Sequence, residues 1–512
     1  MATHTPSEHQ AAIYDAVRYG TGDIMVNSVA GSGKTYTIEE ITKILNTRRA
    51  IVLAFNKHIA DEVQGRLKGT NVTATTIHAF GYRALLRSLY TVKLEPKVDG
   101  AKYTKIARVY VNATLSRELR VLVDQNDQDA KQLVDGRTRA LSQLVNMARL
   151  TLTYSDDYAA LADLMSKYGI VTDGPEGDAI VIAGVRPVLD NGIDAATKEK
   201  VFDYTDMIWL PLILRVRIDL FDWVLVDECQ DLNACQLALV LRLRALGGRY
   251  VFVGDEFQAI MGFSGADAHS FRKIAETTGA AILPLSVCYR CPSSHLEIAR
   301  QYVPHIQDRP NAPKGTIRTV SEDDAPRQIG TGAMVLCRMT APLVALCLKL
   351  IASGKPARVR GKEIGTGLIE LAQNIGRLAG MNGGFIETLD QWEAGQIERL
   401  QERDNAEVLI DAVRDRCEAL RVLYTEYGAT LAGLCAKITE IFKDEKASIT
   451  LSTIHRAKGL EADDVFILYP EILPLERPGM TEDQYQQEVN VTYVAYTRSR
   501  DRLTLIERRK SA

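Results

Sequence analysis

The amino-acid sequence predicts an α/β protein with two parallel-sheet domains in series, each carrying a mainly helical insertion. Three observations support this prediction. Short apolar runs rich in β-branched residues recur along the chain, most of them precede a loop and a helical pattern, and two longer stretches have mostly helical periodicity. Continuous apolar strands that alternate with helices are typical of parallel sheets covered on both faces.

The predicted strands form two sets. The first set comprises residues 23–26, 50–53, 223–226 and 250–253. The second set comprises residues 281–283, 334–336, 449–451 and 465–468. Two such sets indicate two α/β cores that follow one another along the chain.

The stretches between the strands set the expected domain boundaries. Residues 91–200 are polar and mostly helical in pattern, and residues 369–446 are rich in Glu, Arg, Leu and Ala, as amphipathic helices are. A chain of 512 residues has room for about three or four domains. We therefore expect a first α/β domain at 1–90 and 201–280 with its insertion at 91–200, and a second at 281–368 and 447–512 with its insertion at 369–446.

The composition is that of an ordinary water-soluble protein, with 46% hydrophobic and 25% charged residues. Residues 1–8 are polar, and no uninterrupted apolar stretch approaches the length that crosses a membrane, so we expect a cytoplasmic protein without a membrane partner. The net charge of −3 argues against broad electrostatic wrapping of nucleic acid but allows a narrow basic groove.

The eight cysteines are scattered along the chain, as is typical of reduced thiols in a cytosolic enzyme. Only Cys288 and Cys291 have the spacing of a metal-binding pair, and neither a second such pair nor a nearby His pair completes four ligands. We therefore expect no zinc site there.

A candidate phosphate-binding loop lies at residues 30–35, Ala-Gly-Ser-Gly-Lys-Thr, after a predicted strand and before a helical pattern. In such a loop the glycines let backbone N–H groups point at phosphates, Lys34 reaches the outer phosphates, and Thr35 offers its hydroxyl to Mg²⁺. The strict pattern has Gly where this chain has Ser28. A glycine-rich turn without a ligand is the alternative, and the strand–loop–helix context favours nucleotide binding over it.

Two further strand ends carry polar residues suited to nucleoside triphosphate hydrolysis. Asp227 and Glu228 close an apolar strand, where one carboxylate can hold Mg²⁺ through water while its neighbour polarises the attacking water. Such a pair alone is often only a solvated loop, but the upstream phosphate loop makes it the other half of a hydrolysis site. After a third strand, Gln258 is placed to sense the γ-phosphate or to position water.

In order from residue 10 to about residue 505, these motifs resemble those of the UvrD/Rep-type superfamily 1 DNA helicases. The segments 288–292, 451–461 and 493–500 add to the resemblance. It implies two RecA-like P-loop domains with parallel sheets and an ATP site at their interface, with Mg²⁺ held by Thr35 and Asp227. The nucleotide contacts that it implies are Gln10, Gly31, Ser32, Gly33, Lys34, Thr35, Tyr36, Tyr289, Arg290, Glu461 and Arg498.

The resemblance also implies catalytic roles. Glu228 is expected to be the general base, Arg290 a γ-phosphate contact and Arg498 the arginine finger, and Lys34 and Gln258 complete the expected catalytic set. An arginine finger contributes about 10³–10⁵-fold in rate in related phosphoryl-transfer enzymes.

Contacts with single-stranded DNA are a further implication of the resemblance. Phe263 is expected to stack on bases, and such stacking tolerates any base sequence. The expected DNA-binding residues are Phe55, Asn56, Lys57, Thr76, His78, Phe263 and His455.

The chain departs from the family pattern at several places. Tyr36 stands where the family usually has Arg, and Ser264 follows Phe263 where the family continues with Arg. The second insertion is cut to residues 369–446, which is closer to compact relatives such as the F-box helicase group, although no F-box-like segment is apparent.

We therefore expect an ATP- and Mg²⁺-dependent translocase and helicase that moves 3′ to 5′ on single-stranded DNA, binds single/double-strand junctions and is monomeric in solution. The choice of DNA and the polarity come from the resemblance, and the sequence does not identify protein partners. A non-unwinding factor that strips proteins from DNA or regulates recombination remains open, because the shortened insertion favours it. A nucleotide-switched binding protein is disfavoured, since Glu228, Gln258, Arg290 and Arg498 are all present.

Overall fold

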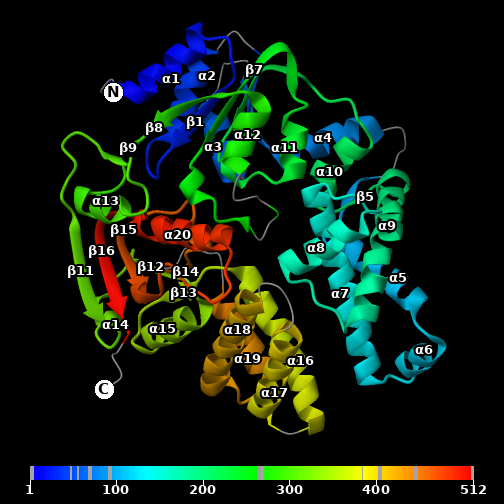
Figure 1. Cartoon of the computed structure of the whole chain (residues 1–512). Coiled ribbons are helices and arrows are strands. Elements are labelled where there is room, and N and C mark those ends of the chain that lie inside the picture. The colour runs from blue at the N-terminus through cyan, green and yellow to red at the C-terminus, as the bar shows by residue number, and fades with distance from the viewer. Residues whose placement is uncertain are drawn as a thin grey trace. The chain divides into compact units, whose positions relative to one another are not determined.

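The computed structural model describes residues 5–45, 49–54, 57–66, 72–89, 95–262, 265, 270–382, 384–401, 406–442 and 448–508. By its internal contacts the chain divides into two compact units. The first unit comprises Met1–Ser28, Gly33–Glu256 and Met261–Leu285, and the second comprises Val29–Ser32, Phe257–Ile260 and Ser286–Ala512. Figure 1 labels most of the helices and strands of each unit.

The first unit is built on a six-stranded parallel sheet with the strand order β3-β2-β6-β7-β1-β8. Successive residues of a strand pack into different hydrophobic clusters, with Met25 in one and Ile24 and Val26 in the other. Because both faces are buried, these strands are apolar along most of their length. They are β1 (Ile24–Ser28), β2 (Ala50–Ala54), β3 (Val72–Thr76), β6 (Phe221–Val226), β7 (Arg244–Gly254) and β8 (Ala281–Leu285).

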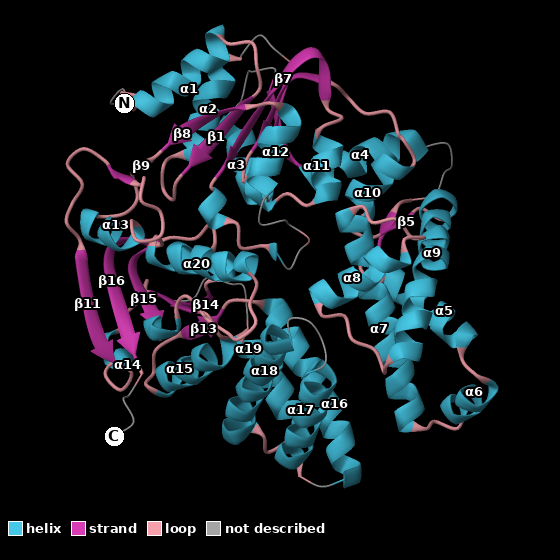
Figure 2. Cartoon of the chain, viewed as in Figure 1, coloured by secondary structure: helices cyan, strands magenta, loops and turns pink. Residues whose placement is uncertain are grey.

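Helices connect these strands and pack on the sheet (Figure 2). The first helix begins at a capping box, in which Ser7 and Gln10 each accept a hydrogen bond from the other's backbone N–H. The helices of this α/β core are α1 (Glu8–Tyr19), α2 (Lys34–Ile44), α3 (Lys57–Arg66), α4 (Ile77–Leu89), α10 (Asp206–Ile213), α11 (Ala234–Val240) and α12 (Ser270–Thr278).

The first insertion is a helical layer between two short paired strands, β4 (Lys97–Val98) and β5 (Val201–Phe202). A buried polar network fixes this layer to α10. The Asp206 carboxylate is fully buried and accepts hydrogen bonds from Lys102 Nζ at 2.5 Å and Arg149 Nη1 at 3.0 Å. Arg149 also pairs with Asp203, so two cations and two carboxylates balance. The helices are α5 (Lys102–Thr114), α6 (Arg117–Asp124), α7 (Gln128–Thr151), α8 (Tyr158–Tyr168) and α9 (Pro175–Lys198).

The second unit has its own six-stranded parallel sheet, with the order β11-β16-β15-β12-β14-β13. Its central strand β12 is buried at every residue, whereas the edge strand β11 is half-buried or exposed throughout. The strands are β11 (Thr316–Ser321), β12 (Met334–Cys337), β13 (Ala357–Val359), β14 (Ile449–Thr453), β15 (Ala462–Leu468) and β16 (Ser499–Glu507).

The remaining elements of the second unit include a short parallel pair, β9 (Val287–Cys288) and β10 (Gln307–Asp308). The four described helices of its second insertion begin at Lys362 and end at Ile441, whereas the sequence predicted an insertion at residues 369–446. The helices are α13 (Ser293–Ala299), α14 (Ala325–Gln328), α15 (Thr340–Ala352), α16 (Lys362–Asn382), α17 (Phe385–Gln401), α18 (Ala406–Tyr427), α19 (Leu431–Ile441) and α20 (Glu482–Tyr496).

The two parallel sheets with their helical insertions confirm the predicted fold class. The assignment of residues 281–283 to the second set of strands is wrong, because β8 pairs with β1 along Ile24–Ser28. An apolar run shows that a strand is present but not which sheet it joins, and only the pairing decides that. Among the described residues, no helix is both long and apolar enough to span a membrane.

Candidate nucleotide site

The phosphate loop connects β1 to α2, as the sequence predicted. Gly31 and Gly33 have φ angles of +66° and +82°, which favour glycine because a Cβ is strained in this region. At Gly31 a Cβ would also lie 2.5 Å from the Arg290 Cβ. Ser28, at the position where the strict pattern has Gly, is still in β1 and donates a hydrogen bond from its hydroxyl to the Gly254 carbonyl at 2.7 Å. Ser28 therefore replaces the glycine of the strict pattern at a strand position, where a side chain is tolerated.

The loop has a polar interior that a phosphate group fits. The Ser32 hydroxyl is buried and has no hydrogen-bond partner among the described residues. Thr35 is half-buried in the first turn of α2, directly after Lys34. An unsatisfied buried hydroxyl beside a helix N-terminus is typical of an anion site, since the first N–H groups of a helix have no partner within it.

Lys34 pairs with a carboxylate at the end of β6. Its Nζ lies 2.8 Å from Glu228 Oε1. Burial of Lys34 opposes its protonation, but the charges of Glu228 and Asp255 outweigh burial and raise the pKa of the Lys34 ammonium above its ordinary value. Lys34 is therefore a permanent positive charge at the start of α2.

Asp227 lies next to this pair and is itself buried. Burial, followed by repulsion from Glu228, raises the pKa of the Asp227 carboxyl to about 7. Glu228 has a φ of +52°, a strained conformation for a residue with a side chain, and such strain concentrates at functional sites. A carboxyl that ionises reluctantly beside a second carboxyl is suited to a cation, which would relieve the repulsion between them.

Gln230 connects two strand ends at this site, a role that sequence reasoning missed. Its amide nitrogen donates to Glu228 Oε2 at 2.6 Å, and its amide oxygen accepts from the backbone N–H of Asp255 at 3.1 Å. Gln230 thus holds the Glu228 side chain relative to the end of β7. The residue lies inside the Asp-Glu-Cys-Gln-Asp motif, and its position there was the only available signal.

Two of the predicted nucleotide contacts, Gln10 and Tyr36, lie on α1 and α2. Gln10 is buried, and its amide nitrogen donates to the Thr37 hydroxyl at 3.3 Å while its amide oxygen caps α1. Tyr36 is half-buried and lies on α2, one turn before Glu40. Burial, and then the charge of Glu40, raises the pKa of the Tyr36 phenol.

Gln258 and Arg498 meet within the second unit. Sequence reasoning placed Gln258 in the first α/β half, but the contacts of Phe257–Ile260 group this segment with the second unit. The Gln258 side-chain oxygen accepts from Arg498 Nη2 at 3.2 Å, and its carbonyl accepts from Lys458 Nζ at 2.5 Å. Arg498 is almost fully buried and is also held by the Val494 carbonyl at 2.9 Å.

A second arginine of this unit, Arg290, is also held by hydrogen-bond acceptors. Arg290 Nε lies 2.5 Å from Glu461 Oε2, and Arg290 Nη1 donates to the Thr497 carbonyl at 3.2 Å. Its neighbour Tyr289 donates its backbone N–H to the Gly31 carbonyl at 2.8 Å. The structure therefore brings together Arg290 and Glu461, two of the nucleotide contacts predicted from the sequence.

The predicted DNA-binding residues are described only in part. Phe55, Asn56 and Phe263 lie outside the described residues. Lys57 is exposed at the start of α3, and the Thr76 hydroxyl accepts from the Ala79 N–H at 3.2 Å.

Two histidines of the predicted DNA contacts are held neutral. Burial lowers the pKa of His78 although Asp203 opposes this effect. Burial, together with the charge of Arg338, lowers the pKa of His455 to about 3. In the protein without DNA, both imidazoles are therefore mainly uncharged at neutral pH.

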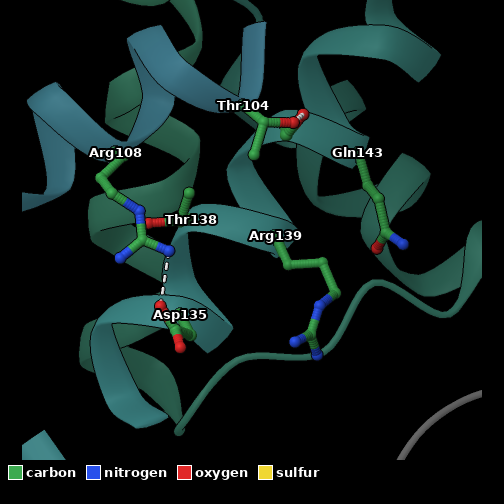
Figure 3. A pocket seen from close by; sticks show the side chains of 7 residues that line it. Thr104, Arg108, Asp135, Thr138, Arg139 and Gln143 are labelled. Carbon is green, nitrogen blue, oxygen red and sulfur yellow. Dashed lines mark hydrogen bonds and ion pairs between the residues drawn. The ribbon is translucent and has the colours of Figure 1, made fainter. Parts of the chain in front are cut away.

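A polar hollow lies elsewhere, between α5 and α7 of the first insertion (Figure 3). Arg108 and Asp135 form an ion pair at its wall. None of the residues predicted from the sequence to bind nucleotide or DNA lines it. The lining residues are Thr104, Arg108, Asp135, Thr138, Arg139, Ser142 and Gln143.

Comparison with known protein families gives two matches. The UvrD/REP helicase N-terminal domain matches residues 9–278, and the UvrD-like helicase C-terminal domain matches residues 448–506. The first match alone spans more than half of the 512 residues.

Individual relatives are similar at low identity. F-box DNA helicase protein 1 of Schizosaccharomyces pombe is 24% identical over 94% of this chain, and the chain spans 55% of that protein's length. ATP-dependent DNA helicase UvrD2 of Mycobacterium tuberculosis is 24% identical over 96% of this chain and 77% of its own length. ATP-dependent DNA helicase Rep of Salmonella typhimurium is 24% identical over 57% of this chain and 43% of its own length.

Proposed function

The chain belongs to the UvrD/Rep helicase family, and we propose that it hydrolyses ATP to move 3′ to 5′ along single-stranded DNA and to unwind duplex DNA. The observation that carries this proposal is the pairing of Lys34 with Glu228 at 2.8 Å beside the buried Asp227. A lysine of a phosphate loop, a general base and a metal ligand are the parts that nucleoside triphosphate hydrolysis needs.

In the first unit, Lys34 and Glu228 would separate when ATP binds. Lys34 would turn to the β- and γ-phosphates, because their charge exceeds that of one carboxylate. Glu228, which Gln230 holds in place, would then accept the proton of the attacking water. Thr35 and Asp227 would hold Mg²⁺, which when bound supplies positive charge to the phosphate oxygens.

In the second unit, Arg498 and Arg290 would supply positive charge to the transferring phosphoryl group. Carbonyl and carboxylate acceptors hold both side chains, so little reorientation would be needed when the charge develops. The hydrogen bond from Arg498 to Gln258 would couple the γ-phosphate sensor to the arginine finger.

Hydrolysis would be coupled to DNA movement through the interface of the two RecA-like domains, as the family resemblance implies. A nucleotide site of that kind closes around the γ-phosphate and relaxes after hydrolysis. Stacking of bases on Phe263 would give a grip of about 1–3 kcal/mol per base that is independent of sequence.

Tailed duplexes test this proposal. Fluorescently labelled duplexes with a 3′ tail, a 5′ tail or no tail are incubated with the protein, ATP and Mg²⁺, with Lys34→Ala as the inactive control. We expect ATP-dependent unwinding of the 3′-tailed duplex only. Unwinding of the 5′-tailed duplex alone would overturn the polarity, and no unwinding of any duplex would overturn the helicase activity.

A second candidate function is favoured by the small insertion of the second unit, which consists of α16 to α19. In this case the protein would use ATP to strip other proteins from DNA without unwinding it. Displacement of streptavidin from the biotinylated 5′ end of a single strand, without unwinding of the tailed duplexes, would support this function. Unwinding of the 3′-tailed duplex would exclude it as the sole activity.

A further inference from the structure

Cys288 and Cys291 bracket Tyr289 and Arg290, two of the predicted nucleotide contacts. Cys288 ends β9 and Cys291 precedes α13, and both side chains are fully buried. Their spacing is that of a metal-binding pair, but no group of three or more His, Cys, Asp or Glu side chains in the described part of the chain could hold a metal ion. Two ligands are too few for a structural zinc site. The pair therefore needs another explanation.

The two sulfur atoms have unequal environments. The backbone N–H of Cys291 donates to Cys288 Sγ at 3.4 Å, and the Cys291 thiol donates to the Thr497 carbonyl at 3.5 Å. A sulfur that accepts N–H bonds is stabilised as a thiolate, whereas a sulfur whose hydrogen is already bonded to a carbonyl stays protonated. This polarity makes Cys288 the nucleophile and Cys291 its neighbouring thiol.

Acidity sets Cys288 apart from the other cysteines. The neighbouring Cys291 side chain and the backbone N–H groups of Cys291 and Arg290, against the effect of burial, lower the pKa of Cys288 to about 7. By contrast, burial raises the pKa of Cys337, Cys347 and Cys417 to about 12 each. A thiolate near neutral pH with a second thiol three residues away is typical of Cys-X-X-Cys redox pairs.

We propose that Cys288 and Cys291 are a reversible oxidation site, at which a hydroperoxide forms an intrachain disulfide that slows ATP turnover. The Cys288 thiolate attacks one peroxide oxygen, the O–O bond breaks, and a sulfenic acid and hydroxide form. The Cys291 sulfur then attacks Cys288 Sγ, the S–S bond forms and water leaves. In total, two thiols lose two electrons and two protons, and hydrogen peroxide becomes two waters.

The disulfide would act on the nucleotide contacts next to it. The Thr497 carbonyl accepts from both the Cys291 thiol and Arg290 Nη1, so removing the thiol donor disturbs the anchor of Arg290. On the other side, Tyr289 donates its backbone N–H to the Gly31 carbonyl of the phosphate loop. Closing a ring through residues 288–291 restricts the backbone at both contacts. This consequence rests on the proposed ATP hydrolysis, whereas disulfide formation does not.

Burial of the pair determines which oxidant can reach it. Both sulfur atoms are shielded from solvent, so a small hydroperoxide fits the proposal better than a bulky disulfide. Cys435 is the half-buried cysteine of the chain, and burial raises the pKa of its thiol. It therefore provides the matched control, a more accessible but less acidic thiol.

The test uses the full chain treated with hydrogen peroxide, alkylated and digested with trypsin. Arg290 lies between the two cysteines, so trypsin separates them into peptides 274–290 and 291–300 unless a disulfide joins the two. We expect the joined pair by mass spectrometry after peroxide, its loss after dithiothreitol, and its absence in Cys288→Ser and Cys291→Ser. The Cys435→Ser variant should still form it. Absence of the joined peptides in the wild type would overturn the proposal.

ATP hydrolysis is measured on the same samples. Because misplacing a binding group by roughly 1 Å can cost about 10²-fold in rate, we expect oxidation to lower turnover by about tenfold or more in the wild type and in Cys435→Ser. Dithiothreitol should restore it, and Cys291→Ser should resist the loss. A disulfide that leaves turnover unchanged would overturn the regulatory part. Failure of the proposed function would show differently, as absent hydrolysis in the reduced protein.

Discussion

The hydroxyl of Tyr493 accepts a hydrogen bond from the backbone N–H of Ala30, at 2.8 Å, at the start of the phosphate loop. Both residues are fully buried and share a hydrophobic cluster with Val29 and Leu296. Tyr493→Phe keeps the ring in this cluster, so no cavity forms. The substitution removes the acceptor of the Ala30 N–H and leaves this buried donor without that hydrogen bond.

The size of the effect is worked from this lost hydrogen bond. A buried donor left unsatisfied costs about 1–3 kcal/mol. If the loop of the free variant relaxes so that water binds this N–H, ATP has to return the loop to its original conformation. That return costs the free energy of the unsatisfied donor and weakens ATP binding. At roughly 1.4 kcal/mol per tenfold change in an equilibrium constant, we expect the Kd for ATP to rise about 5- to 150-fold. Turnover at saturating ATP should stay within about threefold, because the groups that act in the transition state are unchanged.

The assay is titration of the wild type and the variant with a fluorescent ATP analogue, followed by steady-state hydrolysis over a range of ATP concentrations. Tyr496→Phe is the matched control, since Tyr496 lies one turn further along α20 and stacks on Tyr302 instead. A Kd for Tyr493→Phe equal to that of Tyr496→Phe would refute the reasoning. A large fall in turnover with unchanged Kd would also refute it.

Three further predictions concern catalysis, stability and pH dependence. Arg498→Ala should lower turnover by about 10³–10⁵-fold with a smaller effect on ATP binding, and steady-state hydrolysis near the wild-type rate would contradict an arginine-finger role. Asp206→Asn should destabilise the first unit by about 3–5 kcal/mol in urea unfolding, because it leaves Lys102 and Arg149 with one buried carboxylate in place of two; no loss of stability would show that the network is not needed. The pKa of His455 is about 3 in the folded state, whereas in the unfolded state it has its ordinary value of about 6.5. As the pH falls below about 6.5, a proton binds to the unfolded state and not to the folded state, so the stability falls. From pH 7 to pH 5 the free energy of unfolding of the wild type should fall by about 2 kcal/mol more than that of His455→Gln. Equal losses would show that folding does not hold the His455 imidazole in its neutral form.

The central strands of both sheets could be predicted because they are buried on two faces and are therefore apolar without interruption. The strands that were missed carry polar residues. β3 is Val-Thr-Ala-Thr-Thr, and β16 begins with Ser-Arg-Asp-Arg. β8 was detected but placed in the wrong sheet, since residue composition does not determine which strands pair. A search for apolar runs thus finds apolar strands and misses strands that carry polar residues, and it does not show which strands pair.

The candidate site was predicted where its residues lie within one short motif. The phosphate loop and the Asp227–Glu228 pair each follow a strand, so their local geometry could be read from the sequence. The contacts between distant segments could not be predicted. Gln258 meets Arg498 across 240 residues, and Lys102 meets Asp206 across 104. No periodicity or motif spacing encodes such pairs, because they depend on how the sheets and insertions fold.

The most direct test of the central claim is the rate of ATP hydrolysis with and without single-stranded DNA, measured for the wild type and for Lys34→Ala. We predict strong stimulation by DNA in the wild type and no hydrolysis in the variant, because Lys34 is the phosphate-loop cation that pairs with Glu228. A rate of ATP hydrolysis that does not change with DNA, or hydrolysis that persists in Lys34→Ala, would contradict the proposal that this chain is an ATP-driven motor stimulated by DNA.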